Sequence, residues 1–199
     1  MKDFTTFFLV LIVITILYLY LETKALKVTY VESMIDNKKY LVRDLPDKQN
    51  AADLLAQIKN KLSNLTTHLD NNKEKEEFNG RKDGIERLNK NFKPDNISES
   101  SPGNSYTSYS INKGEKIVFC IRAKRQSNKL MDINTMMFVA IHELAHLMSK
   151  SIGHTSEFWD NMKFLLEIAV QLGIYKKQDF NNNPVDYCGM KITDTPLNE

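Results

Sequence analysis

The sequence predicts an α+β fold in which a small antiparallel or mixed sheet packs against helices, preceded by an N-terminal transmembrane helix. Three features support this prediction: an apolar run near the N-terminus, two pairs of β-rich segments, and helical periodicity in the second half of the chain. With 199 residues, of which 42% are hydrophobic and 26% charged, the chain has room for one compact domain and a short appendage. We therefore expect an anchor with its flank over residues 1–27 and one folded domain over residues 28–199.

The anchor is predicted from the segment between Phe4 and Leu21, which contains 18 consecutive uncharged residues. A helix of this length just crosses the hydrocarbon core of a bilayer. A cleaved signal peptide is the alternative, but its apolar core would be unusually long, and residues 23–25 make a poor cleavage site. We therefore expect a single-pass membrane protein. Lysines flank the run on both sides, so the positive-inside rule does not decide which side of the membrane the domain faces.

Residues 28–105 are expected to begin with a β-hairpin and to continue mainly as helix. β-rich runs on either side of Asp36 and Asn37 predict the hairpin, and apolar residues from Ala51 to Leu69 recur at helical spacing. Polar and charged stretches separate the remaining elements. The expected order is strand 28–31, turn 36–37, strand 39–42, helix 47–69, exposed loop 70–82, short helix 85–91 and a second loop over 95–105.

The second half of the chain predicts another hairpin followed by two helices. The strand-like runs Tyr106–Ile111 and Lys116–Ile121 are separated by a short turn that contains a glycine. Helical periodicity then extends from Ile133 to Gly153, where a left-handed glycine would end the helix. The elements expected after it are a helix that starts after Thr155 or Ser156 and ends at Gly173, and one short strand over Tyr187–Ile192.

Charge and cysteine content exclude some functions and leave others open. The formal net charge of +2 provides no strongly basic face, so we expect no nucleic-acid partner. The two cysteines, Cys120 and Cys188, allow either one disulfide or two buried free thiols, and the sequence does not choose between them. One local basic cluster is interpreted as a solvated loop beside a strand, and it consists of Arg122, Lys124, Arg125 and Lys129.

The chemistry is predicted from the segment His142-Glu143-Leu144-Ala145-His146. His142 and His146 are four residues apart on a predicted helix, so their imidazoles leave the same face and can reach one zinc ion. The Glu143 carboxylate would then lie beside the metal, where it can accept a proton from bound water as a general base. The sequence therefore predicts a catalytic zinc site on this helix.

The third zinc ligand is expected to be His154, with Glu167 as the alternative. His154 follows His146 after seven intervening residues and precedes Thr155, a good helix N-cap, so the returning chain can bring its imidazole over the metal. Glu167 lies on the second predicted helix, where some zincins place a glutamate ligand, but its helical neighbours Lys163 and Gln171 suggest a solvated face. Four acidic residues are candidates for orienting an imidazole, namely Glu157, Asp160, Asp186 and Asp194.

The stretch from His142 to Trp159 resembles the WLM and SprT-like small metallopeptidases. The resemblance rests on the His-Glu-x-x-His motif, the later His154 and the aromatic pair Phe158-Trp159, and it extends over about residues 106–192. It implies a zincin-like metallopeptidase core, with zinc held by His142, His146 and His154 and with Glu143 as general base. In many relatives five residues separate the second and third histidines, whereas seven do here.

The predicted function is therefore that of a membrane-anchored zinc metallopeptidase that hydrolyses proteins or peptides. An edge strand of the second hairpin would pair with an extended substrate, and Tyr109 and Tyr187 are candidates for stabilising the oxyanion. The alternative is a catalytically inactive, membrane-tethered interaction module that retains zinc. An intact Glu143 favours the enzyme, because a structural zinc site needs no general base and usually has four protein ligands.

Overall fold

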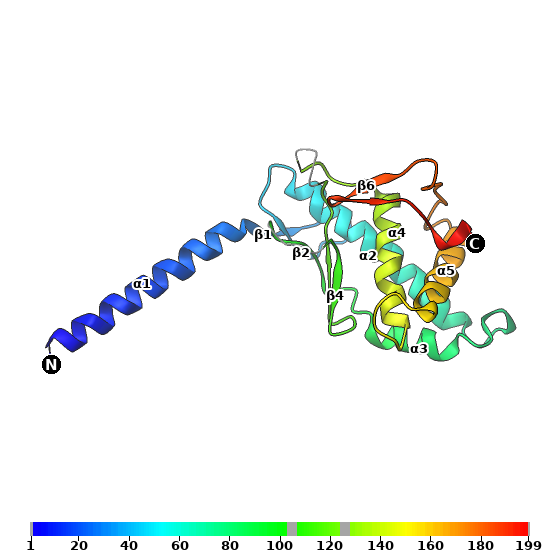
Figure 1. Ribbon diagram of the computed structural model, residues 1–199, viewed down its shortest axis with the longest axis horizontal. Coiled ribbons are helices and arrows are strands. Elements are labelled where there is room, and N and C mark those ends of the chain that lie inside the picture. Colours follow the sequence, from blue (N-terminus) through cyan, green and yellow to red (C-terminus); the bar gives the residue numbers. More distant parts are fainter. Residues whose placement is uncertain (1, 103–106, 124–127, 199) are drawn as a thin grey trace.

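The computed structural model describes residues 2–102, 107–123 and 128–198. Its first element is the long helix α1 (Lys2–Leu26), which projects from the remainder of the molecule and has no buried residue over Phe4–Leu21 (Figure 1). The other elements follow as β1 (Val28–Glu32), β2 (Lys39–Arg43), α2 (Lys48–Asn72), the short 3₁₀ helix η1 (Glu76–Phe78), α3 (Lys82–Asn91), β3 (Ile97–Glu99), β4 (Tyr109–Ile111), β5 (Lys116–Phe119), α4 (Ile133–Met148), α5 (Ser156–Gln171), β6 (Val185–Tyr187), β7 (Met190–Ile192) and the 3₁₀ helix η2 (Pro196–Asn198).

The described strands form three small sheets, in agreement with the predicted α+β class. β1 and β2 form the first expected hairpin, and Asn37 in its turn has a φ of 55°, which asparagine tolerates well. The mixed sheet has the order β3-β5-β4, in which β3 is parallel to β5 and β4 is antiparallel to it. The central strand β5 is therefore paired on both sides, whereas β4 is an edge strand.

The core is formed by buried side chains of the helices α2 to α5 together with those of the sheets. α2 contributes Leu55, Ile58 and Leu62, and α4 lies against it with Ile141 and Leu144, all of them fully buried. Burial of a side chain of this size contributes about 1.5–3 kcal/mol. α4 thus runs through the middle of the folded body, between α2, α3 and α5 (Figure 1).

Two segments that were expected to be loops contain some buried structure. In the segment 70–82, α2 continues to Asn72, and η1 buries Phe78 edge-on against Phe164 of α5, with ring centroids 5.6 Å apart. In the segment 95–105, β3 pairs with β5, and Ile97 and Glu99 are buried. The prediction of an exposed loop is confirmed for most of residues 70–82 and fails at Phe78, whereas the loop predicted over 95–105 was wrong at β3. The contacts that bury these residues come from distant parts of the chain and leave no local periodicity.

Within the predicted basic cluster, Arg122 is not solvated as expected, whereas Lys129 is exposed. Arg122 is 2% exposed, and it donates to Glu99 through Nε and to Asp47 through Nη1, both at 2.7 Å. A guanidinium at this depth requires such partners, because an unpaired buried charge is strongly unfavourable. Lys124 and Arg125 of the cluster, and Tyr106 of the predicted strand, lie outside the described residues.

The C-terminal segment forms a third hairpin and not the single strand expected over Tyr187–Ile192. β6 and β7 pair in antiparallel fashion around Cys188 and Gly189, whose φ angles of 48° and 89° are typical of a two-residue hairpin turn. Cys188 forms a disulfide with Cys120, just after β5. The choice that the sequence left open between a bridge and two free thiols is therefore resolved in favour of the bridge, which connects this hairpin to the central sheet.

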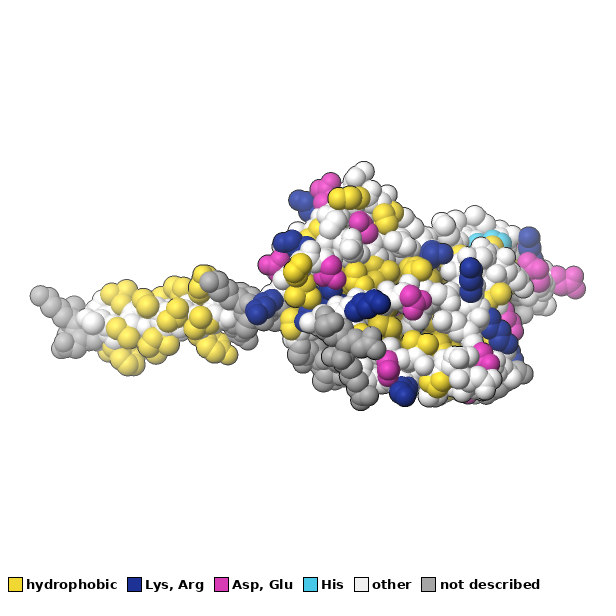
Figure 2. Space-filling model, turned by 90° about the horizontal axis from the view of Figure 1, so that it is seen from above, with side chains coloured by type: hydrophobic (Ala, Val, Ile, Leu, Met, Phe, Trp, Pro, Cys, Tyr) yellow, Lys and Arg dark blue, Asp and Glu magenta, His cyan; other side chains and the backbone are white. Residues whose placement is uncertain are grey.

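The helix α1 is long and apolar enough to cross a membrane, and it is the one such helix in the described residues. None of the segment Phe4–Leu21 is buried, and its apolar side chains form a continuous outer surface (Figure 2). Length and composition alone do not separate an anchor from a signal sequence, since both pass the same test.

Candidate metal centre

The candidate site is located on the second half of α4. This helix begins at the N-cap Asp132, whose carboxylate accepts from the backbone N–H of Thr135 at 2.9 Å. It ends at Met148, because Ser149 adopts an extended conformation with its hydroxyl bonded to the Ala145 carbonyl at 2.7 Å. The prediction that the helix continues to Gly153 was therefore wrong. Gly153 has a φ of 83°, as expected for a left-handed glycine, but it lies in the connection to α5.

The structure brings three histidine side chains together. His142 and His146 lie one turn apart with their Nε2 atoms at 3.3 Å, and the Nε2 atom of His154 lies 3.1 Å from that of His142. The candidate ligand atoms of the three residues all lie within 4.8 Å of one another. Glu167 is exposed on the outer face of α5 and does not belong to this cluster.

The Phe158 ring forms the floor of this cluster. Its centroid lies 4.8 Å from His142, 4.3 Å from His146 and 4.7 Å from His154, and the side chain is fully buried. Trp159 lies beside the outermost imidazole, with its ring centroid 5.6 Å from that of His154. The aromatic pair noted in the sequence therefore packs against the imidazoles and limits their rotation.

Burial of the site changes the proton affinities of its side chains. Burial, followed by the neighbouring imidazoles, lowers the pKa of His142 to about 3. Burial, followed by His154 and Lys113, lowers the pKa of His146 to about 4. Both imidazoles are therefore neutral at pH 7, the state in which a ring nitrogen can bind a metal without first losing a proton.

Glu143 lies beside the histidine cluster and outside it. The side chain is 4% exposed and lines the same cavity as the three imidazoles, and burial raises the pKa of its carboxyl to about 7. A carboxyl whose pKa lies near the working pH suits general acid–base chemistry, since it can both accept and return a proton. The cluster thus presents three nitrogen donors and one adjacent carboxyl that is not among them.

The cluster opens into a cavity of about 680 Å³. It is lined by the segment from Thr107 to Ser110, which includes part of the edge strand β4, and by the C-terminal residues Met190, Ile192, Thr193 and Asp194. β5 cannot offer a free edge, which excludes Lys116–Ile121 as the substrate strand and leaves β4 as the candidate.

Of the two tyrosines considered for the oxyanion, Tyr187 has the more defined environment. Its hydroxyl is hydrogen-bonded to the hydroxyl of Ser108, whose oxygen accepts from the backbone N–H of Cys120 at 3.1 Å. The side chain is buried, lines the cavity together with Glu143, and has a raised pKa because of burial. Tyr109 on β4 is partly exposed at the same cavity.

The four acidic residues considered as partners of an imidazole take different positions. Glu157 accepts hydrogen bonds from the backbone of Lys150 and Ser151 and not from an imidazole. Asp194 lines the cavity, whereas Asp160 and Asp186 are exposed. Sequence reasoning did not identify the contacts of Arg87 and Asn161 with the end of α4. A local sequence pattern could not predict them, because Arg87 donates to the carbonyl of Met148, which lies 61 positions away in the chain.

A helix carrying His-Glu-x-x-His, a third imidazole on the returning chain and small sheets around them define a metallopeptidase-like protein. The WLM domain family matches residues 85–196, and the chain belongs to this family. Membership implies a metalloprotease that acts on proteins, and the three-histidine cluster is consistent with zinc.

Two viral proteins and one solved structure illustrate the range of similarity. An uncharacterized protein of Acanthamoeba polyphaga mimivirus is 38% identical over 189 residues, which cover 95% of this chain and 94% of that protein. An uncharacterized protein of Invertebrate iridescent virus 3 is 38% identical over 84 residues, 42% of this chain and 50% of that protein. The crystal structure of Wss1 from Saccharomyces cerevisiae superposes with a TM-score of 0.48 at 20% identity, over 66% of this chain and 88% of that one.

Proposed function

We propose that this protein is a zinc-dependent peptidase in which His142, His146 and His154 hold the metal and Glu143 is the general base. One observation carries the proposal: three imidazole nitrogens converge within 4.8 Å while a buried carboxyl beside them stays out of the cluster. Three neutral nitrogen donors fit a catalytic zinc ion, which has three protein ligands and an open fourth position. A structural zinc site would need a fourth protein ligand, and it would not use Glu143 as a general base.

Zinc, when bound, supplies a Lewis acid that polarises the substrate carbonyl and makes a bound water more acidic. The contribution of the chain itself lies in proton transfer and orientation. Glu143 accepts the proton of the attacking water and later returns it to the leaving amine. Because the carboxyl is buried beside the imidazoles, it is held at the reacting centre in a medium of low polarity, where this transfer is favoured.

Substrate binding is proposed along the edge strand β4. An extended peptide would continue the sheet there, and its side chains would enter the cavity between β4 and the C-terminal hairpin. Exposed apolar side chains at this cavity favour bulky apolar residues near the scissile bond, and they include Ile152, Trp159 and Met190. The Tyr187 hydroxyl is the proposed hydrogen-bond donor to the oxyanion.

A single-pass anchor over residues 4–21, with the folded domain over residues 28–199, completes the proposal. It is supported by the exposed apolar surface of α1, which has no counterpart in the folded body to cover it. The intact mass of the mature protein separates this proposal from a cleaved signal sequence. Retention of residues 1–27 in alkali-extracted membranes supports an anchor, and their loss identifies a signal sequence.

The enzymatic proposal is tested by measuring zinc content and cleavage of casein or a peptide library for the wild type and two variants. We expect Glu143→Gln to keep zinc while hydrolysis falls roughly 10²–10⁴-fold, the usual contribution of a general base. We expect His154→Ala to lose most of its zinc, with Glu167→Gln as the matched control that keeps it. Equal turnover by the wild type and Glu143→Gln would contradict the mechanism. Zinc loss in Glu167→Gln alone would reassign the third ligand.

A further inference from the structure

The third imidazole of the candidate metal site lies on the irregular connection between α4 and α5. His154 is an exposed residue in an irregular segment from Ser149 to Thr155, and its neighbour Ile152 is 86% exposed. Gly153 has a positive φ, and a Cβ atom placed there would meet nothing within 4 Å. Such a segment would be mobile by itself, and fixing each residue costs about 1–2 kcal/mol of conformational entropy. A ligand on it binds well only if other contacts hold the backbone.

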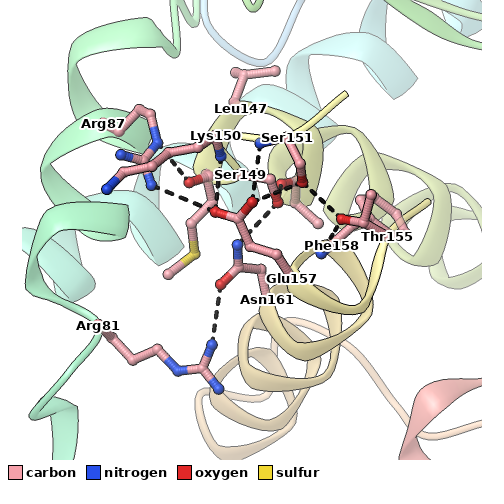
Figure 3. Close-up of polar contacts among 12 residues, drawn as sticks. Arg81, Arg87, Leu147, Ser149, Lys150, Ser151, Thr155, Glu157, Phe158 and Asn161 are labelled. Carbon is pink, nitrogen blue, oxygen red and sulfur yellow. Dashed lines mark hydrogen bonds and ion pairs between the residues drawn. The ribbon is translucent and has the colours of Figure 1, made fainter. Parts of the chain in front are cut away.

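Glu157, in the first turn of α5, supplies those contacts. Its carboxylate accepts from the backbone N–H groups of Lys150 and Ser151, both at 2.9 Å, and from the Ser151 hydroxyl at 2.7 Å (Figure 3). These hydrogen bonds lower the pKa of Glu157 to about 2, so the group is ionised at neutral pH. One carboxylate thus holds the beginning of the segment against the helix that follows it.

Two residues on either side of His154 are also joined to each other. The Ser151 hydroxyl is hydrogen-bonded to the Thr155 hydroxyl at 2.7 Å, and Thr155 in turn caps α5. Ser151 and Thr155 thus both belong to the Glu157 network (Figure 3). His154 lies between them in the chain, inside a turn that these hydrogen bonds close. Little freedom remains for the backbone that carries the third imidazole.

Cationic side chains secure the carbonyl groups at the end of α4. Arg87 of α3 donates to the Met148 carbonyl at 2.8 Å, and its guanidinium lies 3.9 Å from Glu157. Lys113, in the β4–β5 turn, donates to the Lys150 carbonyl at 2.7 Å. Positive groups at the C-terminal end of a helix are favoured by the helix dipole and by the unpaired carbonyls there. The segment is thus held from α3, from the β4–β5 turn and from α5.

We infer that Glu157 is a positioning residue for the metal site, which holds the 150–155 turn so that His154 reaches the position defined by His142 and His146. The inference rests on the proposed zinc site and deepens it. It also accounts for the wider spacing of His146 and His154, because the carboxylate gathers the additional residues of the connection into an ordered turn. Glu157 touches neither substrate nor metal in this assignment.

The test compares Glu157→Gln with Asp160→Asn in the full-length chain in detergent micelles. Asp160 lies on the same helix, is exposed, and loses the same charge, so it is a matched control. Zinc affinity is measured by competition with a chromophoric chelator, and coordination by the visible spectrum of the cobalt-substituted protein. We expect Glu157→Gln to bind zinc about 10–100-fold more weakly and to show an altered cobalt spectrum, while Asp160→Asn matches the wild type.

A second readout does not depend on metal. In the metal-free protein, hydrogen exchange at the amides of Lys150 and Ser151 should be faster in Glu157→Gln than in the wild type and in Asp160→Asn. Glu157→Asp serves as a further variant if Glu157→Gln does not fold, since it keeps the charge but shortens the reach. Wild-type zinc affinity together with unchanged amide exchange in Glu157→Gln would overturn the inference. Absence of zinc binding in the wild type would instead overturn the proposed function, while the exchange data would still decide the role of Glu157 in the turn.

Discussion

The helices α1 and α4 are both strongly apolar, yet their surroundings differ completely. No residue between Phe4 and Leu21 of α1 is buried, whereas most residues of α4 are buried in the centre of the folded body. Figure 2 shows the first as a continuous hydrophobic rod beside a body whose surface mixes charged, polar and apolar side chains.

The difference shows that apolar composition does not by itself tell where a helix resides. The apolar side chains of α4 are covered by α2, α3 and α5, and His142, Glu143 and His146 in its second half line a cavity. α1 has no charged residue between Phe4 and Leu21, and none of this segment is buried, so its apolar surface stays exposed in the structure. Carboxyl and imidazole side chains within an apolar helix thus indicate that the helix is buried beside a candidate site.

The largest expected effect of a single substitution is in α4. Ala140 is fully buried, and Ala140→Asp would place an unpaired carboxylate in the core. We expect the domain to unfold. Burying an unpaired charge costs nearly as much free energy as the total stability of a typical domain, which is about 5–15 kcal/mol. Circular dichroism and urea unfolding would show the loss. The counterpart Val13→Asp in α1 should leave the unfolding transition of the domain unchanged, and a shift there would break the comparison.

Two milder substitutions, one in each helix, compare how much α4 and α1 contribute to the free energy of unfolding. Leu144→Ala removes a fully buried side chain of α4 and should lower the free energy of unfolding by about 2–5 kcal/mol. Leu11→Ala removes a half-exposed side chain of α1 and should change it by less than about 0.5 kcal/mol. Urea titration in the presence of a chelator keeps metal binding out of both values. Equal costs would mean that α1 packs on the domain.

For binding to a membrane, substitutions in α1 should matter more than substitutions in α4, the reverse of their effects on the stability of the domain. Val13→Arg places a charge in the middle of the apolar run of α1 and should disfavour insertion by about 2.5–3.5 kcal/mol, close to a 100-fold change in partition. Flotation with phospholipid vesicles measures the change, and Leu144→Ala should float like the wild type. Vesicle binding that is insensitive to Val13→Arg would argue against the proposed anchor.

The smallest predicted effect concerns the beginning of α4. Asp132 accepts hydrogen bonds from the backbone N–H and the hydroxyl of Thr135 at 2.9 and 2.6 Å. Asp132→Ala should therefore lower the free energy of unfolding by about 1 kcal/mol, the usual value of an N-cap. The exposed Asp160→Ala is the control and should change it by less than about 0.5 kcal/mol. A cost for Asp132→Ala no larger than that of the control would show that this cap contributes nothing.

Local interactions explain which parts of the fold could be predicted from the sequence. Periodicity and capping residues predicted α5 and its N-cap Thr155, and turn residues predicted both the β1–β2 and the β4–β5 hairpins. In each case the determining contacts join residues only a few positions apart, so the pattern is visible in a short window. The spacing of His142 and His146 belongs to the same class, because a single helical turn places both side chains on one face.

The missed strand β3 and the misjudged burial of Arg122 have a different cause, which the disulfide shares. β3 pairs with a strand 20 residues further along the chain, with Ile97 opposite Ile117, and Arg122 is neutralised by Asp47, 75 residues away. The disulfide joins residues separated by 68 positions. Such contacts depend on how the elements pack together, and no local window contains both partners.

By itself, the sequence determined the apolar helix α1, the helix that carries His142, Glu143 and His146, and the chemical class of the site. Tertiary structure alone decided that His154 and not Glu167 lies beside the other two imidazoles, that β4 and not β5 has a free edge, and that Glu157 binds the turn between the helices. The physical reason is the distance along the chain between the residues that interact. Helical spacing is set by bonds between near neighbours, whereas convergence of side chains from separate elements is set by packing of the whole core.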